Sequence, residues 1–70
     1  MYIAIKDEGL MEMHAVRSAY YLAEEESLNF DGMGFTFVFK PFKKDVADTL
    51  MKRLFTDGKL NMTSYNCTIM

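Results

Sequence analysis

Several residue types that often carry recognisable chemistry are scarce in this chain. Among 70 residues there are one cysteine, one histidine, one proline and no tryptophan. A single cysteine, Cys67, excludes an internal disulfide and a metal site built from several cysteines. No apolar run approaches the roughly 18 residues that a transmembrane helix needs. The first apolar stretch is too short for a signal peptide, so we expect a protein of the reducing cytoplasm.

The composition is that of a small globular protein. Half of the residues are hydrophobic, 14% are aromatic and 26% are charged, which is unlike the composition of disordered chains. Seventy residues suit one domain, so we expect residues 1–70 to form a single unit. The net charge of −2 is too small to indicate nucleic-acid binding by charge alone.

The hydrophobic pattern changes its period along the chain, and each change predicts a new element. Residues 9–26 repeat at helical spacing, with alanines on one side. The pair Asp31-Gly32 predicts a tight turn between two strands. Pro41 predicts the start of a second helix and Gly58 its end. The predicted elements are, in chain order, a strand at 2–6, a helix at 9–26, a short strand at 28–30 that the pattern leaves open, a strand at 33–40, a helix that starts at Pro41 and ends before Gly58, and a strand at 60–69.

This order, β-α-(β)-β-α-β, predicts a small two-layer α+β sandwich. In such a fold two helices cover one face of a three- or four-stranded antiparallel sheet. If residues 28–30 form a strand, the arrangement becomes ferredoxin-like.

The predicted core lies between the sheet and the two helices. Strand alternation places Phe35, Phe37 and Phe39 on the core side. The partners that we expect for these rings are Ile3, Ile5, Leu50 and Leu54. The last strand is expected to turn Tyr65, Cys67 and Ile69 to the same core. Among the seven methionines, Met51 and Met62 are expected to fill gaps in the core.

The residues needed for catalysis do not come together in this pattern. Nucleophilic catalysis needs a cysteine or serine beside a base. On the predicted helix Ser18 follows His14 by about one turn, but no carboxylate stands where it would orient the imidazole. No second histidine or cysteine can join His14 at a metal ion. We therefore expect no enzyme activity, no cofactor and no metal.

One string bears on nucleic-acid binding. Residues 31–38 read DGMGFTFV, which is similar to the RNP1 signature of RNA-recognition motifs and lies on the corresponding strand of the predicted topology. The resemblance implies RNA binding through aromatic rings that stack on bases. The string departs from the signature at Asp31, Met33 and Val38, where a basic residue and two aromatic residues are expected.

The last four residues, Cys67-Thr68-Ile69-Met70, match a prenylation box and resemble the ends of farnesylated eukaryotic proteins. Prenylation of Cys67 would attach the protein to a membrane, and without it we expect no membrane contact. No basic cluster and no flexible spacer precede the box. Burial of Cys67 and Ile69 in the last strand is the alternative that we favour.

Methionine is abundant, and its flexible side chain suits adaptable binding surfaces. A domain of this size has a small core, so part of its apolar surface is left for a partner. We therefore expect a non-enzymatic protein-binding module, an inhibitor or adaptor of a larger protein. Its size, methionine content and lack of catalytic groups resemble the accessory proteins with which bacteriophages block host factors. The alternatives are a structural homo-oligomer, such as a homodimer, and an RNA-binding domain.

Two surfaces are candidates for the partner contact. The outer side of the first predicted helix carries a stripe at i, i+4, i+7 and i+11 spacing, flanked by two glutamates. Tyrosine and arginine often dominate binding energy at interfaces, although this stripe also fits an ordinary solvated surface. The stripe and its flank consist of Leu10, His14, Arg17, Tyr21, Glu24 and Glu25. The alternative surface is the open sheet face around Tyr2, Lys6, Val38 and Lys40.

Overall fold

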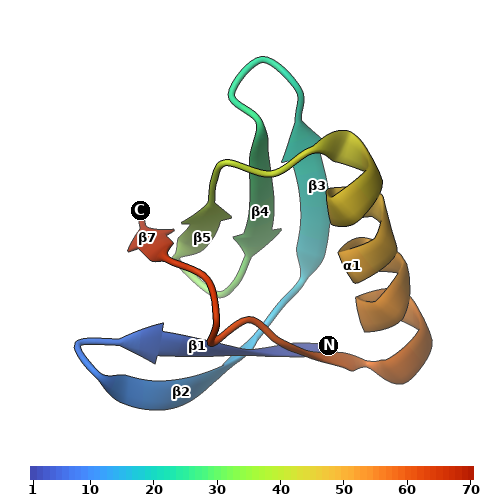
Figure 1. Cartoon of the computed structure of the whole chain (residues 1–70). Helices are drawn as coiled ribbons and strands as arrows, with labels where there is room; N and C mark the ends of the chain where they lie inside the picture. Colours follow the sequence, from blue (N-terminus) through green and yellow to red (C-terminus); the bar gives the residue numbers. More distant parts are fainter.

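The computed structural model describes every residue, Met1–Met70, and contains one helix and seven strands in two sheets (Figure 1). The predicted ferredoxin-like layout with two helices is therefore wrong. The elements are β1 (Tyr2–Asp7), β2 (Leu10–Ala15), β3 (Ser18–Leu22), β4 (Ser27–Asp31), β5 (Thr36–Phe39), α1 (Lys44–Asp57), β6 (Lys59–Asn61) and β7 (Cys67–Ile69). The fourteen-residue α1 is neither long nor apolar enough to cross a bilayer.

The two sheets are built differently. The first has the order β2-β1-β6, in which β1 is antiparallel to β2 and parallel to β6. The second has the order β3-β4-β5-β7 and is antiparallel throughout. In Figure 1, β1 and β2 run crosswise below the strands of the second sheet, and α1 stands beside β3.

The region predicted as the first helix forms two strands instead. Glu8 and Gly9 have φ values of 50° and 82°, and two consecutive left-handed residues make the tight turn that joins antiparallel strands. This turn pairs Asp7 with Leu10 and commits the residues that follow to β2. Strand alternation replaces the helical period because pairing with β1 outweighs the intrinsic helix propensity of this segment.

The chain passes from one sheet to the other between β2 and β3. The Val16 N–H donates to the Met1 carbonyl at 2.8 Å, and the next N–H, of Arg17, donates to the Asp31 carbonyl at 2.7 Å. Adjacent residues are thereby bonded to different sheets. The strand predicted at 28–30 is confirmed as part of β4, which follows β3 after a turn in which Glu26 has a φ of 50°.

The hydrophobic core fills the space between the two sheets and α1. Phe37 and Phe39 lie in it as predicted, whereas Phe35 is 54% exposed because it precedes β5. Met62 is fully buried and Met51 packs against the core, as expected for these two methionines. The buried cluster consists of Ile3, Ile5, Val16, Leu28, Phe30, Phe37, Phe39, Phe42, Ala47, Leu50, Leu54, Leu60 and Met62.

The helix predicted after Pro41 is present, but it begins later than expected. Residues 40–43, which we call the Phe42 strap, precede it and belong to no helix or strand. The Phe42 N–H donates to the Glu26 carbonyl at 2.7 Å, and the Tyr21 hydroxyl donates to the Phe42 carbonyl at 2.7 Å. The predicted end of the helix is confirmed by Gly58, whose φ of 77° places it in the left-handed region favoured by glycine.

The strand predicted at 60–69 is divided between the two sheets. The Asn61 side-chain oxygen accepts from the Thr63 N–H at 2.9 Å and from the Thr63 hydroxyl at 2.6 Å, so a local turn ends β6. The chain then joins the other sheet as β7. Cys67 is half-buried there, but Tyr65 and Ile69 are exposed, and their predicted place in the core is wrong.

The contrast between two phenylalanines gives a test of this core. Phe37→Ala is expected to lower the free energy of unfolding by about 3–5 kcal/mol, because it empties a fully enclosed site. The matched control Phe35→Ala removes an exposed ring and is expected to change that energy by less than about 0.5 kcal/mol. Urea unfolding of both variants measures the difference, and equal losses would contradict the assigned core.

Candidate functional site

The outer face of the first sheet carries several exposed apolar side chains. Because Ile3 and Ile5 point into the core, the alternate residues of β1 point outward. The register places their neighbours on β2 on the same side. The outward residues, which we call the methionine face, are Tyr2, Ala4, Lys6, Met11 and Met13.

The exposure of these side chains is high for residues of their type. Tyr2 is 54% exposed, Met11 69% and Met13 57%. Ala4, beside them, is only 7% exposed, and Arg53 and Asp57 at the end of α1 border the same groove. Large apolar side chains gathered on one face mark a surface at which another molecule binds.

A shallow groove of about 430 Å³ runs along the methionine face toward the end of α1. Met11, Met13 and Ala4 form its apolar part. Arg53 and Lys59 stand at its other end with one acidic residue, Asp57. The groove therefore combines adaptable apolar contacts with a net positive rim.

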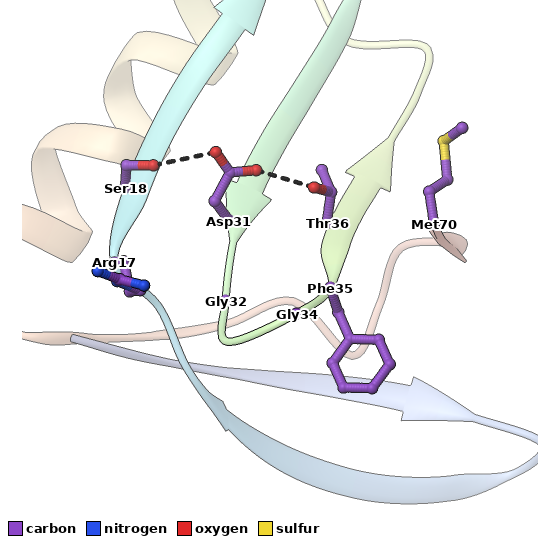
Figure 2. Close-up of a pocket in the computed structure, with 8 residues that line it drawn as sticks. All are labelled: Arg17, Ser18, Asp31, Gly32, Gly34, Phe35, Thr36 and Met70. Atoms are coloured by element: carbon purple, nitrogen blue, oxygen red, sulfur yellow. Dashed lines mark hydrogen bonds between the residues drawn. The ribbon is translucent and has the colours of Figure 1, made fainter.

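A second recess, of about 440 Å³, lies where β3, β4 and β5 meet the turn after Asp31 (Figure 2). The register sets Ser18, Asp31 and Thr36 side by side on neighbouring strands. The Asp31 carboxylate accepts hydrogen bonds from Thr36 Oγ1 at 2.9 Å, Ser18 Oγ at 3.2 Å and the Tyr20 hydroxyl at 3.3 Å. These side chains, which we call the Asp31 row, link β3, β4 and β5 through the Asp31 carboxylate.

The Asp31 row holds a hydroxyl beside a carboxylate but has no imidazole. The only histidine, His14, lies on β2, and its ring nitrogen is hydrogen-bonded to Glu12 at 3.2 Å. Ser18, which the predicted helix placed next to His14, donates to Asp31 instead. No group of three or more His, Cys, Asp or Glu side chains is arranged to hold a metal ion.

The residues of the predicted helix stripe are separated in the structure. Leu10 begins β2 and is exposed. His14 is half-buried, with its ring centroid 4.7 Å from that of Phe37. Arg17 is exposed in the connection between the sheets, beside the Asp31 recess. A single stripe through these three positions does not exist, because the helix that was to align them is not formed.

The remaining members of that stripe lie in or next to the second sheet. Tyr21 is half-buried on β3 and packs against the core, and its hydroxyl donates a hydrogen bond to the Phe42 carbonyl. Glu24 and Glu25 are exposed in the turn between β3 and β4. Tyr21 therefore stabilises the fold, while the two glutamates face solvent.

The alternative partner face is divided between the two sheets. Tyr2 and Lys6 belong to the methionine face. Val38 and Lys40 lie at the outer side of the second sheet, in a recess that Tyr20 also lines. Val38 is buried there, only 7% exposed, whereas Tyr20, Leu22 and Met70 in the same recess are exposed.

The resemblance to RNP1 can be examined residue by residue. Phe37 is 1% exposed and Phe39 is fully buried, so neither ring is accessible for stacking on a base. Phe35 is the one exposed aromatic residue of the string. Recognition of RNA by aromatic stacking normally uses two or three rings on an open sheet.

The residues of the prenylation box are held in the second sheet. Cys67 pairs with Phe39, and Met70 exchanges two backbone hydrogen bonds of 2.9 Å with Thr36. Burial raises the pKa of the Cys67 thiol to about 11, and the charge of Asp7 adds to this effect. The thiol is therefore protonated and poorly nucleophilic at neutral pH.

Sequence reasoning missed that Met11 and Met13 share one surface with Tyr2. A signal for this was present, because residues 10–15 alternate as well as they repeat at helical spacing. The turn at Glu8-Gly9 decides between the two patterns.

Comparison of the chain with protein-family models, with curated proteins and with solved structures finds no match in any of the three.

Tyr20 reports on the Asp31 row. Burial raises its pKa first, and the charge and hydrogen bond of Asp31 raise it further. Asp31→Asn is expected to lower the pKa of Tyr20 without returning it to the ordinary value. NMR titration of the Tyr20 ring measures this shift. Glu25→Gln, the matched control, is expected to have a smaller effect because the Glu25 charge is the weakest of these influences.

Cys67 gives a second test, of thiol reactivity. At neutral pH the folded protein is expected to react with iodoacetamide on the order of a hundredfold more slowly than the urea-unfolded chain, because far less thiolate is present. Asp7→Asn is expected to accelerate the folded-state reaction. Equal rates in the folded and unfolded states would show that Cys67 is not protected by the sheet.

Proposed function

We propose that this protein is a non-enzymatic protein-binding module, an inhibitor or adaptor that acts by covering an apolar surface of a larger protein. The observation that carries the proposal is the exposure of Met11 and Met13, at 69% and 57%, on the outer face of the first sheet. A monomeric protein gains nothing in stability from such side chains, whereas a partner that covers them gains apolar burial.

The chemistry of the groove indicates what kind of partner surface fits it. Methionine side chains are unbranched and flexible, so they adapt to apolar side chains of different shapes. Arg53 and Lys59 stand at one end of the groove, where Asp57 is the one negative group that lines it, and Lys6 lies opposite Met11. An apolar segment flanked by aspartate or glutamate is therefore the complementary partner.

This proposal places the contact on the part of the alternative face that holds Tyr2 and Lys6. The stripe through Leu10, Arg17 and Tyr21 depended on a helix that is not formed, so it is not retained as one surface. A single half-buried cysteine suits a reducing compartment, and we place the protein in the cytoplasm.

The experiment is a selection of peptides on the immobilised protein from a random peptide library. We expect enriched sequences that combine apolar residues with aspartate or glutamate. The double variant Met11→Ser/Met13→Ser is expected to weaken the best peptide by more than about tenfold, or 1.4 kcal/mol. Fluorescence anisotropy with a labelled peptide measures the dissociation constants.

A matched control distinguishes binding at the methionine face from non-specific hydrophobic binding. Val46 and Phe55 are exposed apolar residues of α1, at 42% and 58%, and lie outside the groove. Val46→Ser/Phe55→Ser is expected to leave the dissociation constant unchanged. The proposal is wrong if this control weakens binding as much as the methionine variant does, or if enriched peptides carry no acidic residues.

A further inference from the structure

The outer edge of β2 is an unpaired strand edge. β2 is the terminal strand of its sheet, with β1 on one side and no strand on the other. The Val16 N–H points to Met1, so along β2 the even-numbered residues direct their amides to β1. The N–H and carbonyl groups of Met11 and Met13 therefore point outward.

The one usual protection against pairing that this edge carries is the charged side chain of Glu12. β2 contains no proline and no lysine, and its register with β1 is continuous, without a bulge. No backbone hydrogen bond from a turn or loop reaches Met11 or Met13. The free stretch ends at Ala15, whose carbonyl oxygen lies against Gly32.

The side chains of β2 decide how a second copy of the strand fits this edge. In antiparallel pairing, opposed side chains lie on the same face. A two-fold axis at Glu12 would set two like-charged carboxylates opposite each other, which is unfavourable. An axis at Met13 sets Glu12 of each copy opposite His14 of the other and makes Met13 its own partner. In this second register the Glu12 carboxylate of each copy can accept a hydrogen bond from the His14 ring of the other.

We propose that two copies of this chain associate through their β2 edges, antiparallel and centred on Met13. The backbone groups of the two Met13 residues form the central hydrogen-bonded pair, and pairing beyond it is limited because the Ala15 carbonyl, opposite Met11 of the other copy, lies against Gly32. On either side, Glu12 and His14 of opposite copies are neighbours, extending the contact that they already make within one chain at 3.2 Å. The inference rests on the strand edge and is independent of the function proposed for the methionine face.

Pairing in this register has a geometrical consequence. A two-fold axis perpendicular to the sheet keeps the outer faces of the first sheets of both copies on the same side. The β2-β1-β6 sheets of the two copies become one continuous sheet, and the Met11 and Met13 side chains of both copies form a single apolar surface. The dimer therefore doubles the methionine face without covering it.

Sedimentation equilibrium across a range of concentrations tests association. We expect a mass that rises from 8.1 kDa to twice that value. Met13→Pro removes an outward N–H and no bond to β1, so proline is tolerated there as on other edge strands, and we expect it to abolish the doubled mass. Met13→Ser keeps the N–H and is expected to retain the dimer. Retention of the dimer by Met13→Pro would overturn the proposal, as would a wild-type chain that stays at 8.1 kDa.

Disulfide trapping tests the register separately and does not depend on the proline variant folding. In a Cys67→Ala background, Met13→Cys is expected to form a disulfide-linked dimer on mild oxidation. Opposed residues of a hydrogen-bonded pair have Cα atoms about 5.5 Å apart, within the ~4.4–6.8 Å that disulfides span. Met11→Cys and Glu12→Cys are the matched controls and are expected to remain unlinked. Linkage of Glu12→Cys in preference to Met13→Cys would overturn the register.

Discussion

Two neighbouring amides organise the molecule. Val16 and Arg17 donate their N–H groups to carbonyls of different sheets, the first to Met1 and the second to Asp31. Successive N–H groups of an extended chain point to opposite sides, so Val16 bonds the chain to the first sheet and Arg17 bonds it to the second, and the chain bends at Arg17. The crossing of the sheets, the enclosed core and the side on which α1 packs all follow from this change of direction. The opposite side of the first sheet is left to solvent for the same reason.

The elements that sequence reasoning predicted correctly are those in which local chemistry and long-range packing agree. Gly58 ends α1 because a left-handed residue is needed there, and Phe37 alternates into the core. The prediction of a helix at 9–26 was wrong. The alanines, methionines and glutamates of this segment favour a helix locally, whereas pairing with β1 and β4 requires strands. That pairing is non-local and leaves only weak signs in a single sequence, chiefly the turn at Glu8-Gly9.

The sequence predicted that apolar surface would be exposed, but it did not predict where in the fold that surface lies. An excess of methionine predicted exposed apolar surface, and Met11 and Met13 are exposed while Met62 is buried. The residues of the predicted partner stripe do not form one surface, because their spacing was chosen for a helix and the segment forms strands. Two residues of the alternative face, Tyr2 and Lys6, do lie on the methionine face, since β1 was assigned its correct alternation. The side chains of β2 could not be added to them before the register of the hairpin was known.

The Phe42 strap links the stability of α1 to that of the β3–β4 hairpin. Lys43 provides no side-chain cap at the start of the helix, while Phe42 is tied by its N–H to Glu26 and by its carbonyl to Tyr21. Opening of the hairpin therefore releases the segment that fixes where the helix begins. Helix and hairpin are therefore expected to open as one cooperative unit in native-state hydrogen exchange.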